Sequence, residues 1–445
     1  MNVGFLSTRL AGTDGVSLET AKLAAICSRL GHSVSYCAGE LDADGPPGML
    51  VPEMHFTHPE ARWIHDHSFG VVDPAPDLLS RIASMADTLR HAIATYINDF
   101  AIDVLVPENA LSIPMHVPLG MALTDVIAES GLAVINHNHD FYWERERFQV
   151  NCIGEVLSTA FPPNLPSVQH VVINSLAQDA LRARLGVEAT LLANIFDFAS
   201  AAPALTPFNH DLRTALGLSD QHLLILQPTR VVPRKGIELA IELVRRLREP
   251  AIRTRLLGKE AVLLLTHHAG DEGLDYLQQL RQQAAEAGVP LLYAADRFAP
   301  VAGERAGQKV YSLWDAYVHA DFVTYPSLVE GFGNALIETL YFRLPALVNR
   351  YDVYKADIGP KGFDLVEIDV KGDPRAFAAI DNATVDAVVE GIMDPVTRRR
   401  AVEHNYALAR QHYSFEAATP IVAMLLARAQ RDINRGQEDA IDLPV

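Results

Sequence analysis

The sequence predicts an α/β protein made of two doubly wound domains in tandem. Short apolar runs alternate with longer amphipathic segments along almost the whole chain, which is typical of a parallel sheet with helices on both faces. This alternation stops once, in the small-residue and proline stretch 199–207, and then starts again. The chain has 445 residues, of which 49% are hydrophobic, so each of two domains can have its own core.

The first half of the chain predicts a strand, a helix and a series of further strands. NVGFLS at 2–7 reads as a strand, and 17–30 reads as a helix that ends at Gly31, because glycine is a natural helix stop. The segment 42–73 has turns, aromatic residues and histidines without a clear period, so we expect an insertion there. We expect further strands at 33–38, 102–106, 133–136 and 171–174.

The second half repeats the pattern after the break. We expect helices at 237–248, 274–287 and 334–342, and strands at 223–227, 261–266, 291–294, 322–325 and 346–349. Ligands of doubly wound sheets bind at the carboxyl ends of the strands. The residues that follow each strand are therefore the candidates for a functional site.

Composition excludes several classes of partner. The formal net charge of −18 repels phosphate backbones, so we expect no nucleic-acid partner, and any anionic ligand needs a local basic site. Cys27, Cys37 and Cys152 form no CxxC pair, which favours buried thiols in a reducing compartment. The first residues lack a signal-peptide pattern, and no stretch approaches the roughly 20 apolar residues of a membrane span. We therefore expect a cytoplasmic protein without a membrane span.

The segment LQPTRVVPRKGIELAIELV is the first of two linked signals. A predicted strand ends at Gln227, and Arg230 and Lys235 lie in the loop before a helix that starts at Gly236. Two cations beside a helix N-terminus can bind a diphosphate, because the helix dipole and the unpaired N–H groups add to the side-chain charges. We expect the neighbouring Arg234 to be an ordinary solvated charge.

The segment PSLVEGFGNALIETLYFRLPALV is the second signal. A predicted strand is followed by Glu330, by Gly331 and by a second glycine, and then by a helix that contains Glu338. The glycines allow the backbone to approach a ligand closely, and a carboxylate such as Glu338 can accept hydrogen bonds from ribose hydroxyls. The amides expected to face an anion are those of Gly333, Asn334, Ala335 and Leu336.

The ordered combination EGFGNALIETL after RVVPRKG resembles the retaining glycosyltransferase family 4, which has the GT-B fold. The segments GTDGVSLETAKLAAICSRLGHSV, NHNHD, VINS, ANIFDF and QHYSFE extend the resemblance over nearly the whole chain. It implies two Rossmann-like domains that face each other across a cleft and a C-terminal helix that crosses back to the first domain. The implied ranges are an acceptor domain at 1–200, a donor domain at 201–412, the crossing helix at 413–433 and a loose polar tail at 434–445.

The resemblance also implies roles for site residues. Arg230 and Lys235 would bind the donor diphosphate together with the helix amides, Glu338 would hold the ribose, and Glu330 would contact the hydroxyls of the transferred sugar. His139 would contact the donor sugar near its anomeric carbon. The catalytic candidates are therefore His139, Glu330, Lys235 and Arg230.

The first domain would supply the acceptor side. Gly15 would let the first loop approach the phosphate, and the family's paired glycines appear here as Asp14–Gly15, which makes Asp14 an acceptor candidate. Glu108 and Asn109 follow a predicted strand and point toward the cleft by topology. The acceptor-binding candidates are Asp14, Glu108, Asn109 and Asp140.

Two departures from the family pattern bear on the substrates. YAADRF replaces the usual glycine-containing turn near the nucleotide base, which leaves a GDP-linked and a UDP-linked donor both open. NRYDVYKADIGPKGFDLVEID is weakly similar to transferases of the mannosylglucosylglycerate synthase type, which build compatible solutes on glycerate or glucosylglycerate. We therefore expect a retaining hexosyltransferase that acts on a nucleotide-diphosphate sugar and a small polar acceptor.

We expect no tightly bound cofactor and no required divalent metal. HDH at 65–67 and HNHD at 137–140 resemble metal sites, but no third ligand with fixed spacing is visible in the sequence. DAD at 42–44 lies in a glycine and proline turn, which favours a solvated turn. A homo-oligomer stays open.

Three alternatives share the same scaffold, because a fold does not fix a function. A nucleotide-sugar epimerase would turn over its substrate without an acceptor. A phosphorylase would need a pyridoxal-binding lysine. A non-catalytic nucleotide-sugar-binding protein would show no turnover at all.

Overall fold

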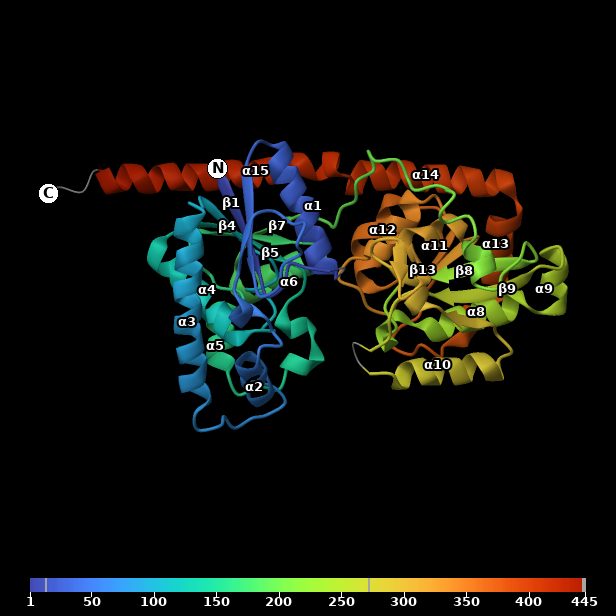
Figure 1. Cartoon of the computed structure of the whole chain (residues 1–445), viewed down its shortest axis with the longest axis horizontal. Helices are drawn as coiled ribbons and strands as arrows, with labels where there is room; N and C mark the ends of the chain where they lie inside the picture. The colour runs from blue at the N-terminus through green and yellow to red at the C-terminus, as the bar shows by residue number, and fades with distance from the viewer. Residues whose placement is uncertain (13, 271–272, 442–445) are drawn as a thin grey trace. The chain divides into compact units, whose positions relative to one another are not determined.

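The computed structural model describes residues 1–12, 14–270 and 273–441 of the chain (Figure 1). These residues form two compact α/β units. Unit 1 comprises Met1–Ile195 together with Phe415–Val445, and unit 2 comprises Phe196–Ser414. The predicted α/β class is confirmed, and so is the return of the C-terminal helix to the first domain.

Unit 1 contains a seven-stranded parallel sheet with the order β3-β2-β1-β4-β5-β6-β7. Its strands are β1 (Asn2–Ser7), β2 (Ser33–Ala38), β3 (Gly48–Leu50), β4 (Val104–Pro107), β5 (Ala133–Asn138), β6 (Val168–Val172) and β7 (Ala189–Leu191). Its helices are α1 (Gly15–Arg29), α2 (Pro59–Ser68), α3 (Leu78–Asp99), α4 (Val117–Ser130), α5 (Gly154–Ala160), α6 (Ser175–Leu185) and α15 (Phe415–Ile441).

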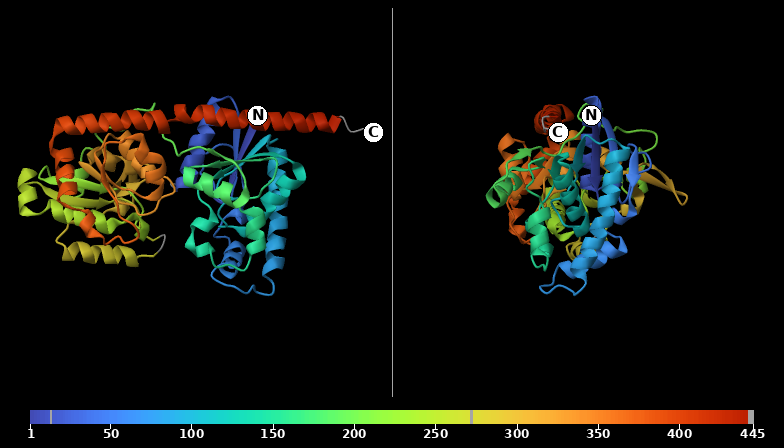
Figure 2. Two further views of the ribbon diagram at one scale, coloured as in Figure 1. Left: turned by 180° about the vertical axis from the view of Figure 1, so that it is seen from behind. Right: turned by 90° about the vertical axis from the view of Figure 1, so that its left-hand side faces the viewer.

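Helices cover both faces of this sheet, which is why its central strands are apolar along their whole length. On one face, α2 to α5 pack against side chains such as Leu105 and Val134. On the other face, α1 and α15 enclose a second cluster that includes Phe5 and Val106. In both views of Figure 2, α15 is the red helix that ends at the C-terminus, and it packs on α1 and β5.

Unit 2 contains a six-stranded parallel sheet with the order β10-β9-β8-β14-β15-β16 and a small sheet with the order β11-β13-β12. Its strands are β8 (His222–Gln227), β9 (Glu260–Leu265), β10 (Leu291–Tyr293), β11 (Phe298–Ala299), β12 (Gly303–Arg305), β13 (Gln308–Ser312), β14 (Phe322–Tyr325), β15 (Ala346–Asn349) and β16 (Val366–Ile368). Its helices are α7 (Leu212–Ala215), α8 (Ile237–Leu247), α9 (Pro250–Arg255), α10 (Asp275–Glu286), α11 (Leu313–His319), α12 (Asn334–Tyr341), α13 (Asn382–Met393) and α14 (Pro395–Tyr413).

Two apolar layers also enclose the sheet of unit 2. Helices α8, α10 and α13 pack on one face, around side chains such as Ile225 and Leu263. Helices α7 and α11 pack on the other, around Leu224 and Val323. The strands of each sheet are therefore well packed on both faces. The loops that follow these strands, at the carboxyl edge of the sheet, contain most of the candidate site residues.

The structure corrects three details of the sequence prediction. The segment 42–73 is not irregular, because it contains β3, a 3-10 turn and α2. The small sheet of β11 to β13 was missed, because its strands are only two to five residues long. The polar segment after residue 433, predicted to be a loose tail, continues α15 to Ile441. Residues 442–445 of that predicted tail lie outside the described residues.

Among the described residues, none of the helices is long and apolar enough to cross a membrane.

Gly120 lies on α4 where a side chain cannot fit. A Cβ atom at this position would lie 2.1 Å from Cζ of Phe161, so Gly120→Ala forces the core of unit 1 to shift. We expect this overpacking to cost about 1–3 kcal/mol and to lower the midpoint of thermal unfolding by about 2–4 °C for each kcal/mol.

Gly154→Ala is the matched control, because a Cβ at Gly154 meets no atom within 4 Å and the residue begins α5. Circular dichroism against temperature measures both variants. Equal midpoints for the two variants would contradict the packing argument.

Candidate active site

In unit 2, the loop after β8 packs against the loop after β14. Residues Pro233–Lys235 form a 3-10 turn, and Gly236 precedes α8 with a φ of 59°. A Cβ at Gly236 would lie 2.5 Å from the carbonyl oxygen of Pro326. Only glycine combines this left-handed backbone with such a close approach. The glycine in PRKG therefore brings the two predicted signal segments together.

A buried carboxylate joins the two loops. Glu330 accepts hydrogen bonds from Nζ of Lys235 and from Nη1 of Arg234, the latter at 3.3 Å. The side chains of Lys235 and Glu330 are only 9% and 7% exposed. Arg234 was predicted to be a solvated charge, and this was wrong, because it also donates to the carbonyl of Val329 at 3.1 Å. Arg230 itself is exposed.

Burial and charge act against each other in this pair. Burial lowers the pKa of Lys235 to about 8, although the charge of Glu330 opposes the shift. Burial alone would raise the pKa of Glu330, but the charges of Lys235 and Arg234 lower it to about 2. At neutral pH the site therefore holds one carboxylate between two cations.

The N-terminus of α12 follows Glu330 in the sequence after three residues. Gly333 has a φ of 135°, and a Cβ there would lie 2.6 Å from Oη of Tyr351, so this position also requires glycine. The sequence predicted that the amides from Gly333 to Leu336 face an anion. The amide of Leu336 instead donates to the carbonyl of Gly333 at 3.0 Å. The first turn of the helix thus already uses one of the four predicted amides.

Glu338 is held by a residue that the sequence did not indicate. The hydroxyl of Tyr317 donates to Oε2 of Glu338 at 2.7 Å. Burial and the Glu338 charge both raise the pKa of Tyr317 well above its usual value, so the hydroxyl keeps its proton. The ring of Tyr317 stacks on Phe342 with a centroid separation of 4.8 Å and an interplanar angle of 8°. The carboxylate of Glu338 therefore has a fixed orientation.

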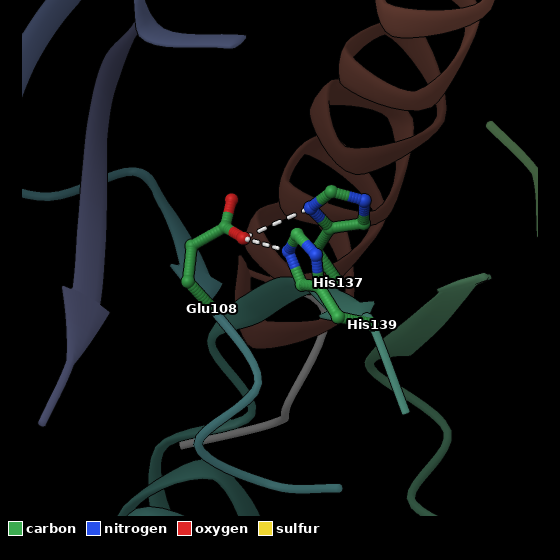
Figure 3. A group of neighbouring side chains, drawn as sticks. All are labelled: Glu108, His137 and His139. Atoms are coloured by element: carbon green, nitrogen blue, oxygen red, sulfur yellow. Dashed lines mark hydrogen bonds and ion pairs between the residues drawn. The ribbon is translucent and has the colours of Figure 1, made fainter. Parts of the chain in front are cut away.

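In unit 1, one oxygen of a second buried carboxylate, that of Glu108, faces two neighbouring imidazoles (Figure 3). Oε2 of Glu108 lies 2.9 Å from Nδ1 of His137 and 3.1 Å from Nε2 of His139. Burial alone would lower the pKa of His139, but the hydrogen bond and charge of Glu108 raise it. Burial would likewise raise the pKa of Glu108, and the charge of His137 lowers it.

These positions change the prediction for Glu108. Its side chain has no exposed surface, so direct contact with an acceptor, as the sequence suggested, does not agree with its burial. Glu108 follows β4, whereas His137 and His139 lie at the end of β5, the neighbouring strand. The buried carboxylate is therefore a hydrogen-bond partner that positions both imidazoles.

Asn109 fixes the same loop from the end of β4. Its Oδ1 accepts the backbone N–H of His139 at 3.0 Å, and its Nδ2 donates to Oδ1 of Asp140 at 2.8 Å. Arg145 then donates through Nε to Oδ2 of Asp140 at 2.6 Å. The predicted residues Asn109, His139 and Asp140 are thus brought together, with Arg145 as an addition that the sequence did not indicate.

Asp14 caps α1 in unit 1. Its Oδ1 accepts the amides of Val16 and Ser17 at 3.1 and 3.2 Å, and its Oδ2 accepts Nη2 of Arg9 at 3.1 Å. Gly15 is the first residue of the helix. Where the family has the first of its two paired glycines, this chain therefore has an aspartate that caps the N-terminus of α1.

One group of side chains among the described residues has the arrangement of metal ligands. It consists of Glu108, His137 and His139, and each offers one ligand atom that lies within 4.8 Å of the other two. The sequence argument against a metal at HNHD relied on the lack of a third ligand, and that argument was wrong because Glu108 comes from the adjacent strand. Both imidazole nitrogens instead hydrogen-bond to the same oxygen atom. Within the part of the chain that the structure describes, the histidines of HDH at 65–67 belong to no such group.

Comparisons with known proteins agree with this geometry. The chain is 30% identical over 444 residues to a mannosylglucosylglycerate synthase of Thermotoga maritima, covering 95% of this chain and 99% of the relative. It is 31% identical over 393 residues to a protein of the same name from Petrotoga mobilis, covering 84% of this chain and 88% of the relative. The chain belongs to the mannosylglucosylglycerate synthase family. No protein-family model matches it.

Solved structures identify the fold as GT-B. Sucrose-phosphate synthase from Thermosynechococcus elongatus has a TM-score of 0.65 and 13% identity, over 96% of this chain and 98% of that chain. Anabaena HepE in complex with UDP and glucose has a TM-score of 0.61 and 16% identity, over 96% of this chain and 100% of that chain. This member of the mannosylglucosylglycerate synthase family is thus a glycosyltransferase with the GT-B fold.

We expect nucleoside diphosphates to bind less tightly as the pH rises through about 8. The protonated form of Lys235 attracts an anion, and burial lowers its pKa to about 8, so the charge is lost above that value. The phosphate groups of the ligand keep their charge over this range, because the second pKa of a phosphate is about 6. Calorimetry with UDP and GDP at several pH values between 7 and 9.5 measures the effect.

Lys235→Arg is the matched variant, because a guanidinium stays protonated up to about pH 12. Its affinity should change little over the same pH range. If the variant lost affinity as steeply as the natural protein, the pH dependence would not come from Lys235.

Proposed function

We propose that the protein transfers a mannosyl group from a nucleoside-diphosphate mannose to glucosylglycerate, with retention of the anomeric configuration. The observation that carries the proposal is its similarity over nearly the full length to two mannosylglucosylglycerate synthases. The weak resemblance of the segment 349–369 to transferases of compatible solutes supports the same substrates.

Unit 2 is proposed to bind the donor. Lys235 and Arg230 bind the diphosphate, together with backbone amides at the start of α12. Glu338, oriented by Tyr317, accepts hydrogen bonds from the ribose hydroxyls. Glu330 is ionised at neutral pH, so its carboxylate accepts hydrogen bonds from hydroxyls of the mannosyl group while it stays paired with Lys235.

Unit 1 is proposed to bind the acceptor and to contact the donor sugar through His139. Two hydrogen bonds position His139. The carboxylate of Glu108 accepts one from Nε2 of the imidazole, and Oδ1 of Asn109 accepts one from the backbone N–H. Gly15 and Asp14 form the start of α1, where the loop after β1 ends. The backbone there approaches the phosphate, and the carboxylate of Asp14 and the amide of Asn109 contact acceptor hydroxyls.

The proposed transfer proceeds on one face of the sugar. The bond between the anomeric carbon and the diphosphate oxygen breaks, and a bond to an acceptor hydroxyl oxygen forms on the same face. The departing diphosphate oxygen takes the proton of that hydroxyl. Lys235 and Arg230 stabilise the negative charge that develops on the diphosphate. Glu330 orients the sugar and forms no covalent bond with it.

The proposed mechanism requires no divalent metal and no bound cofactor. The side-chain cations Lys235 and Arg230 neutralise the diphosphate in the place of a metal ion. We therefore expect transfer to continue at an unchanged rate after treatment with a chelator. A rate that falls with the chelator and returns with one metal would contradict this part of the proposal.

Turnover tests the proposed function. GDP-mannose or UDP-mannose is mixed with glucosylglycerate, and the product is analysed by NMR. We expect a disaccharide glycerate whose new linkage keeps the α configuration of the donor. Lys235→Ala should lower the transfer rate about 100-fold or more, because charge stabilisation in the transition state is lost.

A reaction without acceptor identifies the alternatives. Conversion of the nucleotide sugar in the absence of glucosylglycerate would mean an epimerase. No turnover of either donor with the acceptor present would reject the proposed transferase.

Tyr317→Phe is expected to weaken nucleotide binding through the ribose. Loss of the hydroxyl removes the hydrogen bond that orients Glu338, while the stacked ring stays in place. We expect UDP or GDP to bind about 3- to 10-fold more weakly, a loss of about 0.7–1.4 kcal/mol, because the lost hydrogen bond orients Glu338 and does not itself contact the ligand. The 2′-deoxy nucleotides should change less. Calorimetry measures both ligands.

Tyr311→Phe is the control, because Tyr311 also donates to a carboxylate, that of Asp211, at 3.0 Å in unit 2 but belongs to no part of the proposed site. Equal losses for ribose and deoxyribose nucleotides in Tyr317→Phe would contradict the ribose role of Glu338.

A further inference from the structure

We propose that Arg145 binds the carboxylate of an anionic acceptor in unit 1 and thereby selects acidic over neutral acceptors. This inference rests on the proposed function and assigns the group that recognises the glycerate part of the acceptor.

The charge around the proposed acceptor site requires a cation. A glycerate unit carries a carboxylate, and the chain has a net charge of −18. The loops at the carboxyl edge of the unit 1 sheet add three further carboxylates, those of Asp14, Glu108 and Asp140. An anionic acceptor bound among these groups would be repelled unless a positive side chain faced it.

Arg145 is an ordered cation on the loop that carries His139. Its Nε and Nη2 lie 2.6 Å from Oδ2 of Asp140, and the side chain remains 30% exposed. Arginine has five N–H donors in a planar fork, so it can bind a second carboxylate while the first stays in place. The partial exposure leaves the charge within reach of a ligand.

The position of Arg145 is fixed relative to His139. Asp140, which is only 14% exposed, accepts Nδ2 of Asn109 through its other oxygen. Asn109 in turn accepts the backbone N–H of His139 and the hydroxyl of Ser112, the latter at 2.7 Å. Asp140 and Asn109 therefore connect the cation to the backbone of His139, whose imidazole is proposed to contact the donor sugar. This connection places an acceptor carboxylate at a fixed position relative to the transferred group.

Two neighbouring arginines are less suited to this role. Arg147 is exposed and lies 4.7 Å from the ring centroid of Phe148. Arg9 is bound to the carboxylate that caps α1, and its guanidinium lies 5.4 Å from the ring centroid of Phe56. Arg145, in contrast, is linked to the backbone of His139 through Asp140 and Asn109. The geometry therefore points to Arg145.

The test compares two acceptors that differ in one charge. Glucosylglycerate carries a carboxylate, and glucosylglycerol has a hydroxymethyl group in its place. The natural protein should prefer glucosylglycerate in kcat/KM. Arg145→Gln should lower kcat/KM for glucosylglycerate about 10- to 100-fold, the loss expected for one hydrogen bond to a charged group. The value for glucosylglycerol should change less than about 3-fold, and Arg145→Lys should recover part of the preference, because it keeps the charge without the fork.

Controls separate selectivity from folding. Arg182→Gln removes an exposed arginine of unit 1 that pairs with Glu188 at 2.7 Å, and it should leave both acceptors unaffected. The affinity for UDP or GDP, which the proposed function assigns to groups other than Arg145, Arg9 and Arg182, should be equal in all variants. An equal loss with both acceptors in Arg145→Gln, or a preference that shifts in Arg9→Gln instead, would overturn the inference.

Binding measurements distinguish this inference from the proposed function. Calorimetry with glucosylglycerate and glucosylglycerol, in the presence of a nucleoside diphosphate, needs no turnover. If the natural protein binds glucosylglycerate and Arg145→Gln does not, the inference holds even where no mannosyl transfer occurs. If Arg145→Gln binds glucosylglycerate as tightly as the natural protein does, the inference is wrong even where transfer is established.

Discussion

A buried carboxylate that binds nitrogen groups from another loop is the interaction on which each half of the candidate site depends. In unit 2, Glu330 ties the loop after β8 to the loop after β14 through Lys235 and Arg234. In unit 1, one oxygen of Glu108 lies within hydrogen-bond distance of the imidazoles of His137 and His139. Because an unpaired charge in such a place would be very costly, each carboxylate and its partners stabilise one another. The side chains that face ligands are therefore held in position before any ligand binds.

The parallel sheets explain why these groups meet. Each unit places the carboxyl ends of neighbouring strands at one edge, so residues far apart in the sequence follow adjacent strands there. Lys235 follows β8 and Glu330 follows β14, and these strands are paired in the sheet. The close approach of Gly236 to Pro326 then brings the two loops into contact. A single sterically required glycine thus decides whether the ion pair can form.

The sequence was informative where chemistry is local and less so where it depends on packing. The order of Arg230, Lys235, Glu330 and Glu338 after strands, and the periodic apolar runs, predicted the α/β class and the segments of the site. The partners of these residues come from elements distant in the sequence. Tyr317 reaches Glu338 from α11, and Glu108 reaches His139 from β4, and no spacing rule relates these positions. Short strands such as β7 and β11 were missed because two or three residues give no period. The polar end of α15 was mistaken for a tail, because its sequence shows no apolar period, although the helix extends to Ile441.

The position of α15 has a consequence for how the protein is made. Phe415, Val422 and Leu425 from this last helix complete the apolar layer over β1, β4 and β5. During synthesis, the ribosome finishes the strands of unit 1 first and then needs all of unit 2, at roughly 5–20 residues per second, before the helix emerges. Unit 1 thus spends tens of seconds with one face of its sheet covered by α1 but not yet by α15, while unit 2 has its whole sequence available earlier. The unit whose strands are translated first is therefore the unit that completes its fold last, and until α15 arrives the partly exposed face of its sheet is a surface for chaperones to protect.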